Sequence, residues 1–319
     1  MTAPQLFLGV DGGQSSTTAL VGDETGRVLG EGTGGPCNHV GAAEGRDKLA
    51  RAVSESVAAA CGQAQLNLRG VHFEAACFGM SGGPDDKEAI LAKILPARKL
   101  IVTTDALIAL SGATAGEPGV VTIAGTGSIA FGRNAAGKMV RAGGWGFLFG
   151  DEGGGFDIVR QAVRAALRFE EGWGPETALH GVLLGSTGAP DANEAMHRLY
   201  TNDWPRPRVA ALSKLVDRAA AEGDAMARDI LANAAQQLAT LAITVRQQLF
   251  RPEETVMICH IGGVFESRYL LARFRQLVEL ADGCRPEPPR YGPAAGALLE
   301  AYRAAGMHPG LSGGMELQR

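Results

Sequence analysis

Short apolar runs alternate with glycine-rich turns between residues 6 and 34. They predict strands over 6–10, 17–21 and 27–31, with the turn DETG between the second and the third. From 44 to about 61 the apolar residues recur at helical spacing. Two buried strands follow, in VHFEAACFGMSGG and KLIVTTDALIALSGA, and each runs through a turn into a helix. The first of these helices, DDKEAILAKIL, is expected to be capped, with acids in its first turn. This βββαβαβα order predicts a mixed sheet with helices packed on it.

The second half of the chain repeats the opening pattern after a candidate linker, TAGEPG at 114–119. In both halves a strand, a glycine turn with hydroxyl residues, a strand, a turn ending in Gly and a third strand follow one another. Ser15 lies 11 residues before Gly26, and Thr126 lies 11 residues before Gly137. The spacing then predicts helices over 156–169, 208–221, 225–249 and 266–280, with one strand in TVMICHIGGV. We therefore predict two domains, 1–117 and 118–319, as duplicated folds with a cleft between them.

Length and charge restrict the functional class. A chain of 319 residues is long for one core, which agrees with two domains. The net charge of −4 and the pI near 5.9 argue against a surface built for nucleic acid or anionic lipid. The sequence contains no apolar run long enough to span a bilayer and no signal-peptide pattern, so we expect a cytoplasmic protein. The five scattered cysteines form no CxxC pair, and we expect them to be buried or partly buried thiols in a reducing compartment.

The two glycine turns are candidate phosphate sites. GVDGGQSSTTA is neither a P-loop nor a dinucleotide loop, because a second strand follows it. Asp11 could hold Mg²⁺ through its waters, while Gly12 and Gly13 let the backbone approach phosphate oxygens. In AGTGS, Gly125 and Gly127 could expose N–H groups. Either stretch taken alone could also be an ordinary hairpin turn.

Three further motifs contain candidate chemistry. VTTDA places Asp105 at the carboxyl end of a strand, where α/β folds often hold reactive groups, although a lone Asp there could be a helix N-cap. GGWGFLFGDEGGG offers an aromatic face in Trp145 and an acid in Asp151, which suits a sugar, although it could be a surface loop around a buried Trp. CHIGGVFES predicts a strand, a Gly-Gly turn and a helix start; its His260 is expected to be structural.

Taken in order, these motifs resemble the actin-like ATPase superfamily, and GTGSIAFGRNAAGKMVRAGGWGFLFGDEGGG narrows the likeness. It is similar to the N-acetylglucosamine kinase-like members of the BadF/BadG/BcrA/BcrD ATPase family, from about Leu6 to Tyr302. The resemblance implies an α/β fold of two actin-like (ribonuclease H-like) βββαβα domains around a cleft. The final helix, about 292–304, would pack back near the hinge. It also implies ATP and Mg²⁺ as cofactors, an amino sugar as substrate and a homodimer.

The resemblance also implies roles for single residues. Asp105 would take the proton of the sugar hydroxyl, and Asp11 would organise Mg²⁺. The nucleotide would be held by Asp11, Gly12, Gly13, Ser15, Gly125, Thr126, Gly127, Gly262, Gly263 and Ser267. The sugar would be held by Asn38, Asp105, Ser128, Gly144, Trp145, Gly146 and Asp151. Ile129 also falls in the sugar-binding set, but it stands where the family has a polar asparagine, which leaves the hexosamine open.

We therefore predict a kinase that phosphorylates the 6-hydroxyl of N-acetylglucosamine, or of glucosamine. Another sugar kinase of the same family is an alternative, but the zinc-binding cysteine cluster of the bacterial glucokinase-like group is missing. A second alternative is a regulatory ATPase of the benzoyl-CoA reductase or dehydratase activase type. Those relatives hold an iron–sulfur cluster with paired cysteines, and the scattered cysteines here argue against it. A third is a non-catalytic sugar sensor, which would have little use for Asp105 as a base.

Overall fold

A computed structural model of the chain describes residues 4–13, 15–37, 43–68, 70–81, 87–95 and 97–313. Its contacts divide the chain into two compact units. Unit 1 comprises Met1–Glu117 and Pro288–Arg319, and unit 2 comprises Pro118–Glu287. The prediction of one continuous domain over 118–319 therefore differs from the structure, because the chain returns to unit 1 at Pro288.

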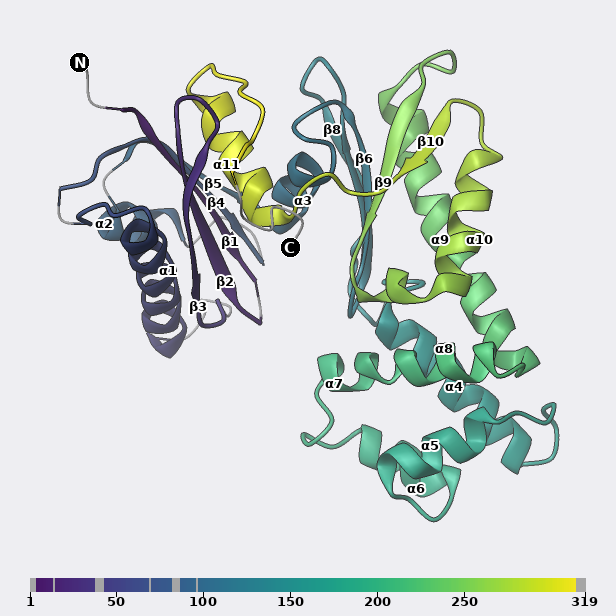
Figure 1. Cartoon of the computed structure of the whole chain (residues 1–319). Coiled ribbons are helices and arrows are strands. Elements are labelled where there is room, and N and C mark those ends of the chain that lie inside the picture. The colour runs from purple at the N-terminus through teal and green to yellow at the C-terminus, as the bar shows by residue number, and fades with distance from the viewer. Residues whose placement is uncertain are drawn as a thin grey trace. The chain divides into compact units, whose positions relative to one another are not determined.

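Unit 1 is built on a five-stranded sheet of order β3-β2-β1-β4-β5 (Figure 1). The first three strands form antiparallel hairpins, while β4 and β5 run parallel to β1. The strands are β1 (Leu6–Gly12), β2 (Thr17–Asp23), β3 (Val28–Gly34), β4 (Phe73–Met80) and β5 (Ala97–Thr104). The helices are α1 (Ala43–Gln63), α2 (Glu88–Ile94), α3 (Asp105–Ala113) and α11 (Pro293–Ala304). This is the expected element order.

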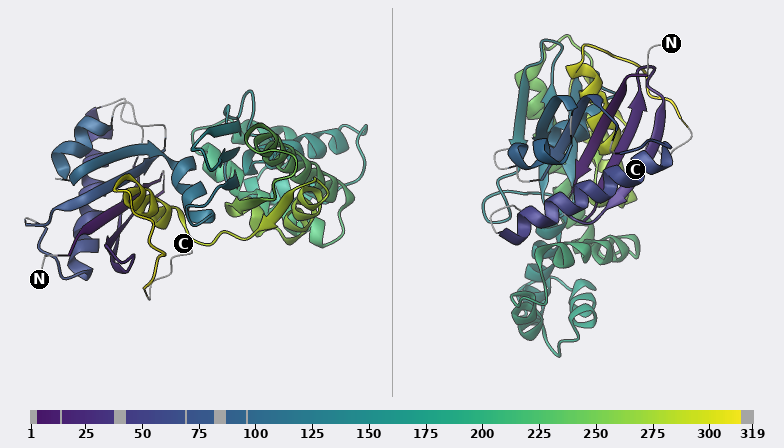
Figure 2. Two further views of the ribbon diagram at one scale, coloured as in Figure 1. Left: turned by 90° about the horizontal axis from the view of Figure 1, so that it is seen from above. Right: turned by 90° about the vertical axis from the view of Figure 1, so that its left-hand side faces the viewer.

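Each face of this sheet is covered by its own helices (Figure 2). α1 and α2 cover one face through a core that contains Leu8, Val53 and Phe78. α3 and α11 cover the other face, where Tyr302 packs 4.4 Å from the ring of Phe7 and donates a hydrogen bond to the Asp23 carbonyl at 2.6 Å. The apolar side of α11 is thus buried on the sheet of unit 1, which is why this segment belongs to that unit.

Unit 2 repeats the topology of unit 1 with a sheet of order β10-β9-β6-β7-β8. Three antiparallel strands are again followed by two that run parallel to the first. The strands are β6 (Gly119–Ala124), β7 (Ser128–Arg133), β8 (Met139–Gly143), β9 (Val256–Ile261) and β10 (Cys284–Glu287). The predicted duplication of an actin-like α/β fold is therefore confirmed at the level of strand order.

The helices of unit 2 pack on its sheet or form a separate layer beyond it (Figure 1). α9 lies across β6, β7 and β8 and beside α10, with a continuous core between them. The helices are α4 (Gly155–Glu170), α5 (Leu179–Thr187), α6 (Ala192–Leu199), α7 (Arg206–Ala211), α8 (Ser213–Ala221), α9 (Ala225–Leu249) and α10 (Arg268–Glu279), with the 3₁₀ turn η1 at Gly263–Glu266.

Some predicted elements differ from the structure. The helix expected over 208–221 is two helices, because Leu212 donates its N–H to the Val209 carbonyl in a tighter 3₁₀-type bond. α2 begins at Glu88, which confirms an acid in its first turn, and Lys87 gives no side-chain cap. The acids expected to cap it, Asp85 and Asp86, lie outside the described residues. Two short helices, α5 and α6, and the edge strand β10 were not predicted.

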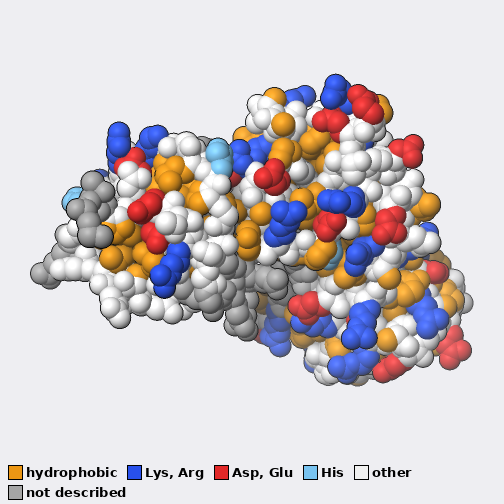
Figure 3. Space-filling view, turned by 45° about the horizontal axis from the view of Figure 1, so that its top comes forward, with side chains coloured by type: hydrophobic (Ala, Val, Ile, Leu, Met, Phe, Trp, Pro, Cys, Tyr) orange, Lys and Arg blue, Asp and Glu red, His pale blue; other side chains and the backbone are white. Residues whose placement is uncertain are grey.

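No helix in the described part of the chain is long and apolar enough to cross a membrane. On the face shown in Figure 3, Lys and Arg side chains lie interspersed with Asp and Glu. This face therefore presents no extended basic patch for a nucleic acid.

Candidate active site

In unit 1 the candidate residues gather at the carboxyl ends of β1, β4 and β5. Asp11 lies next to the end of β1, paired with Thr18 of β2 and in register with Gly79 of β4. The turn after it is closed by the Gly13 N–H, which donates to the Ser16 carbonyl at 3.0 Å. Ser15 is exposed in this turn, two residues before the start of β2. The hydroxyl of Ser15 is thus available to a ligand, whereas the Gly13 N–H is already paired within the turn.

Asp105 is the first residue of α3, directly after β5. The N-cap is Thr104, whose side chain accepts a hydrogen bond from the Leu107 N–H at 3.3 Å, so the N-cap alternative for Asp105 is wrong. The Ser81 hydroxyl donates to Asp105 Oδ2 at 2.9 Å, and the Ser81 N–H donates to the Gly12 carbonyl at 3.3 Å. Ser81 therefore fixes the candidate base relative to the glycine turn.

The environment of Asp11 favours a bound cation. The pKa of Asp11 is raised from 3.8 to about 6, chiefly by burial and secondly by the negative charge of Asp105. A divalent cation beside the two carboxylates would offset both effects. No group of three or more His, Cys, Asp or Glu that could hold a metal occurs among the described residues. The site thus fits Mg²⁺, which is usually held by one or two carboxylates together with water and phosphate oxygens.

Cys37 packs against the glycine turn that follows β1. Its N–H donates to the Gly13 carbonyl at 2.9 Å, and its Sγ lies 3.0 Å from Thr17 Oγ1. Burial raises the pKa of the Cys37 thiol, and the charge of Asp11 adds to this, so the thiol is a packing group and not a nucleophile. Asn38, the predicted sugar ligand that follows, lies outside the described residues.

In unit 2 the second glycine turn joins β6 to β7. The Gly125 N–H donates to the Gly127 carbonyl at 3.0 Å, which corrects the expectation that Gly125 exposes its amide. The first turn of α4 is tied to this turn, since Phe156 N–H donates to the Thr126 carbonyl at 3.1 Å. The amides of Thr126 and Gly127 donate to no backbone carbonyl of the described residues. These two amides and the Thr126 hydroxyl are therefore the groups of the turn that could bind an anion.

The loop of the predicted sugar site lies directly on this turn. Asp151 has its carboxyl group against Gly127, where a Cβ on the glycine would collide with it. Asp151 has a left-handed backbone with φ of 61°, a conformation that costs energy for a residue other than glycine. The predicted sugar ligand Ser128 is buried, and its hydroxyl donates to the Glu152 carbonyl at 2.6 Å. Ser128 therefore holds the loop, and its proton is not available to a sugar.

A buried carboxylate that the sequence analysis missed anchors the other end of this loop. Asp157, in the first turn of α4, accepts hydrogen bonds from the Gly153 N–H at 3.1 Å and from Arg160 at 2.6 Å. The spacing of Asp157 and Arg160 on one helix face is the only signal in the sequence, and it is common in any helix.

Trp145 presents its ring to solvent. Its side chain is 67% exposed, and Arg141 lies over the ring at 4.8 Å from the centroid, so the alternative of a loop around a buried Trp is wrong. Gly144 has φ of +72° and donates its N–H to the Ser128 carbonyl at 2.9 Å. A side chain at this position would meet Ile129, so glycine is required for β7 and the loop to lie so close. Gly146, with φ of +83°, continues the turn.

The third turn follows β9. Gly262 has φ of +113°, and a Cβ there would collide with the carbonyl of Ala124, the residue before the phosphate turn. The Gly262–Gly263 turn and the 125–127 turn are therefore neighbours. Ser267 is the N-cap of α10: its hydroxyl accepts from the Leu270 N–H at 3.2 Å and donates to the Asp217 carboxylate. We expected Ser267 to bind the nucleotide directly. In the structure its hydroxyl is already paired with Asp217 and with the Leu270 N–H.

His260 has the structural surroundings that the sequence analysis expected. It lies between the rings of Phe265 and Phe274, and burial lowers its pKa. The neutral imidazole is therefore part of the core beneath the third turn.

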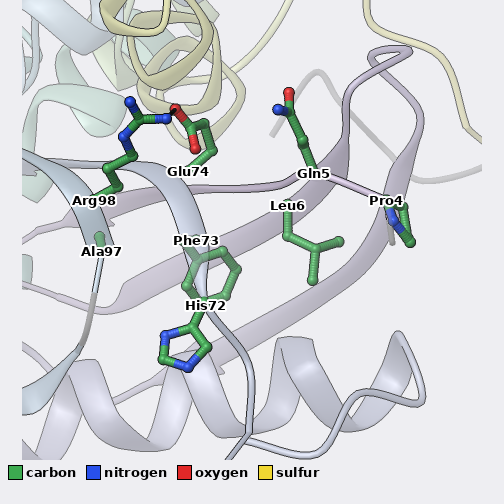
Figure 4. Close-up of a pocket in the computed structure, with 8 residues that line it drawn as sticks. All are labelled: Pro4, Gln5, Leu6, His72, Phe73, Glu74, Ala97 and Arg98. Carbon is green, nitrogen blue, oxygen red and sulfur yellow. Dashed lines mark hydrogen bonds and ion pairs between the residues drawn. The ribbon is translucent and has the colours of Figure 1, made fainter. Parts of the chain in front are cut away.

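A hollow of about 510 Å³ in unit 1 holds none of the candidate residues (Figure 4). It lies at the amino ends of β1, β4 and β5, beside Leu6, Phe73 and the ion pair of Arg98 with Glu74 at 3.0 Å. Reactive groups in α/β folds gather at the opposite, carboxyl ends of the strands. This hollow is therefore not the candidate active site.

Known proteins resemble this chain over nearly its whole length. The sequence model of the BadF/BadG/BcrA/BcrD ATPase family matches residues 8–301. An N-acetylmuramic acid/N-acetylglucosamine kinase from Clostridium acetobutylicum is 31% identical over 279 residues, which are 86% of this chain and 90% of that protein. An N-acetyl-D-glucosamine kinase from Dictyostelium discoideum is 31% identical over 84% of this chain and 88% of its own length. The crystal structure of a putative N-acetylglucosamine kinase from Chromobacterium violaceum superposes with a TM-score of 0.72 at 26% identity, covering 92% of this chain and 98% of that one.

Proposed function

The chain belongs to the BadF/BadG/BcrA/BcrD ATPase family, and from this premise we propose that it is an ATP-dependent hexosamine kinase. It transfers the γ-phosphoryl group of ATP to the 6-hydroxyl of N-acetylglucosamine or glucosamine. The observation that carries the proposal is the pair Asp11 and Asp105, tied together through Ser81 and the Gly12 carbonyl. A phosphate-binding turn beside a fixed carboxylate is the arrangement that phosphoryl transfer to an alcohol requires.

Asp105 acts as the base. One oxygen of its carboxylate accepts from the Ser81 hydroxyl at 2.9 Å, and this bond sets the direction of the group. As the bond from sugar O6 to phosphorus forms, the bond from phosphorus to the bridging oxygen of ADP breaks and the O6 proton passes to Asp105. A carboxylate suits this role because the loose transition state needs positioning more than a strong base.

The phosphates are held by the glycine turns. On unit 1 the Ser15 hydroxyl serves this purpose, and Gly12 and Gly13, which have no side chains, let phosphate oxygens approach the turn although the Gly13 N–H is paired with Ser16. On unit 2 the amides of Thr126 and Gly127 serve it. Asp11 holds Mg²⁺, which when bound supplies positive charge to the transferring phosphoryl group. The raised pKa of Asp11 supports this assignment, because the site disfavours its negative charge until a cation arrives.

The sugar is held by the loop from Gly144 to Asp151. The exposed ring of Trp145 offers an apolar face for the sugar ring, and the Asp151 carboxylate accepts hydrogen bonds from its hydroxyls. Because Asp151 lies against Gly127, a sugar bound to it lies next to the phosphate turn. Asn38 completes this set in the proposal.

Two relatives with similar identity are named for different acceptors, since the bacterial one includes N-acetylmuramic acid and the amoebal one does not. Ile129 lies beside Gly144 and is apolar, so it cannot form the hydrogen bond to the sugar that the family's asparagine would offer. Which amino sugar is the preferred acceptor is therefore the finer part of the proposal. A homodimer and a cytoplasmic location, which the family resemblance implies, belong to the same proposal and are tested by analytical ultracentrifugation and by cell fractionation.

The test is ADP release from Mg²⁺-ATP across a panel of hexoses, glucosamine, N-acetylhexosamines and N-acetylmuramic acid. We expect N-acetylglucosamine or glucosamine to give the highest kcat/KM. Asp105→Asn should lower kcat with that sugar by roughly 10²–10⁴-fold while ATP binding, followed by calorimetry, is retained. Glu55→Gln, an exposed carboxylate of α1, is the matched control and should retain full activity. Sugar-independent ADP release, or an active Asp105→Asn variant, contradicts the proposal.

A further inference from the structure

Unit 2 contains a pocket lined by Gly263 and Ser267, two residues predicted to hold the nucleotide, but no residue was predicted to recognise the base. It has a volume of about 170 Å³ and lies between α8, the first turn of α4 and the segment from Gly263 to Ser267. Pockets that enclose a whole drug-sized ligand usually measure about 300–1,000 Å³. This pocket can therefore take only one part of a nucleotide.

The walls of the pocket divide into an apolar floor and a polar side. Ile158, Leu231 and Val264 are buried and form the floor, which suits the face of a planar ring. The polar side carries Asp217 of α8, which accepts the hydrogen bond of the Ser267 hydroxyl. At the rim, Lys214 pairs with Glu266 at 2.9 Å, but both side chains are exposed and such a pair contributes little to stability.

The position of the pocket indicates which part of a nucleotide it receives. The Gly262–Gly263 turn abuts Ala124, directly before the phosphate turn, and Gly263 also lines the pocket. Ile158 lies one turn of α4 beyond Gly155, whose N–H donates to the Gly125 carbonyl at 2.8 Å. A nucleotide with its phosphates at Thr126 and Gly127 passes its ribose along the Gly262–Gly263 turn. Its base then reaches the pocket.

We infer that Asp217 determines the base specificity of the kinase by selecting a purine with an amino group at position 6. The inference rests on the proposed function, and it adds a residue and a selection rule to it. A carboxylate accepts hydrogen bonds and donates none. The 6-amino group of adenine donates, whereas the 6-oxo group of guanine or hypoxanthine is an acceptor. Two acceptors face each other when a 6-oxo purine enters, so the polar side of the pocket rejects it.

Ser267 is the positioning residue for Asp217. Its hydroxyl donates a hydrogen bond to the Asp217 carboxylate, and its oxygen accepts a hydrogen bond from the Leu270 N–H at the start of α10. The hydroxyl thus ties Asp217, which lines the pocket, to the beginning of α10 through Oδ1. We assign the second carboxylate oxygen to the base. The serine therefore acts on the nucleotide through Asp217.

The test compares ATP with ITP and GTP as phosphoryl donors, with 2′-deoxy-ATP as a further donor. ATP and ITP differ only around position 6 of the base, so their ratio of kcat/KM isolates the contact. We expect the wild type to prefer ATP over ITP by about 100-fold or more. Asp217→Asn, which can donate as well as accept, should reduce this ratio by at least about tenfold. Ser267→Ala should reduce it in the same direction by a smaller factor. Glu222→Gln, at the exposed end of α8, is the control and should leave the ratio unchanged.

Direct binding separates this inference from the proposed function. Titration of ATP and ITP in the absence of sugar measures the same selectivity without turnover. If the protein phosphorylates no sugar but prefers ATP over ITP in a way that depends on Asp217, the proposed kinase function is refuted and the inference about Asp217 stands. A wild type without preference for ATP over ITP overturns the inference, as does an unchanged ratio in Asp217→Asn. It is likewise overturned if this variant alters only the discrimination against 2′-deoxy-ATP, because Asp217 would then bind the ribose. Should Asp217→Asn not fold, the ratio in Ser267→Ala decides.

Discussion

Asp11 should destabilise the ligand-free protein, because its carboxylate is buried and lies near the negative charge of Asp105. The pKa of Asp11 rises from 3.8 to about 6 on folding, first through burial and second through the charge of Asp105. One pKa unit corresponds to about 1.4 kcal/mol, so ionised Asp11 costs the folded state about 3 kcal/mol at neutral pH. Asp11→Asn removes the charge and should raise the stability of unit 1 by up to this amount. The gain is reduced where the new amide finds no hydrogen-bond partner.

The sign of the pH dependence follows from the direction of the shift. A carboxyl group whose pKa is raised by folding binds its proton more tightly in the folded state. Its full contribution to stability is therefore present below pH 3.8, and it is lost as the pH rises to about 6. Asp11→Asn has no such loss. The two proteins should be equally stable near pH 4, and the variant should be more stable by a constant amount above pH 6.

Hydrogen exchange followed by mass spectrometry is the suitable assay, since it reads each unit by its own peptides. Amides of β4 lie in the centre of the unit 1 sheet and should report its opening. A gain of about 3 kcal/mol corresponds to roughly 100-fold slower exchange at pH 7. Glu55→Gln on the exposed side of α1 is the control for the loss of a negative charge and should change exchange little.

Adding Mg²⁺-ATP should reverse the order at pH 7. The wild type gains protection through binding, whereas Asp11→Asn gains far less, because it lacks the group that holds the cation. Faster β4 exchange in ligand-free Asp11→Asn than in the wild type at pH 7 would refute the reasoning. So would a difference of the same size at pH 4.

Two further substitutions test the positioning of the site. Ser81→Ala should lower kcat by roughly tenfold with little change in the KM for ATP, because it frees the Asp105 side chain but leaves the turns intact. Ser81→Thr should restore most of the activity. A rise in the KM for ATP as large as the fall in kcat would contradict this role. Gly262→Ala should weaken ATP binding and cost about 1–3 kcal/mol of stability, since φ is +113° and the Ala124 carbonyl lies in the way. Gly181→Ala, inside α5 with no atom within 4 Å of the new Cβ, is its control and should stabilise the protein by about 0.5–1 kcal/mol in the same thermal melts.

The sequence predicted the duplicated sheet because the repeated turns carry their own chemistry. A glycine turn between two alternating apolar runs predicts a hairpin from local information alone. The equal spacing of Ser15 to Gly26 and of Thr126 to Gly137 then revealed that the hairpin occurs twice. The identical strand order of both sheets follows from this repetition.

The elements that were missed depend on contacts that are distant in the sequence. α5 contains two glycines, which disfavour a helix, and it is stabilised by packing against α4 and α6. β10 contains a proline and charged residues, and it forms only as an edge strand beside β9. Local propensity opposes both elements, so tertiary packing decides them.

The hydroxyl groups show why a correct motif does not settle a residue's role. Ser128 and Ser267 stand in the expected places, yet one donates to the Glu152 carbonyl and the other to Asp217. Ser81 received no role from the sequence, because its partner Asp105 lies just beyond another strand, as the first residue of α3, and becomes its neighbour only when β4 and β5 pair. A hydroxyl has one proton to donate, so the partner that the fold supplies decides whether the group binds a ligand or positions the residue that does. In this protein the hydroxyls of Ser81, Ser128 and Ser267 each donate to another group of the chain, so these three serines are placed to position their partners.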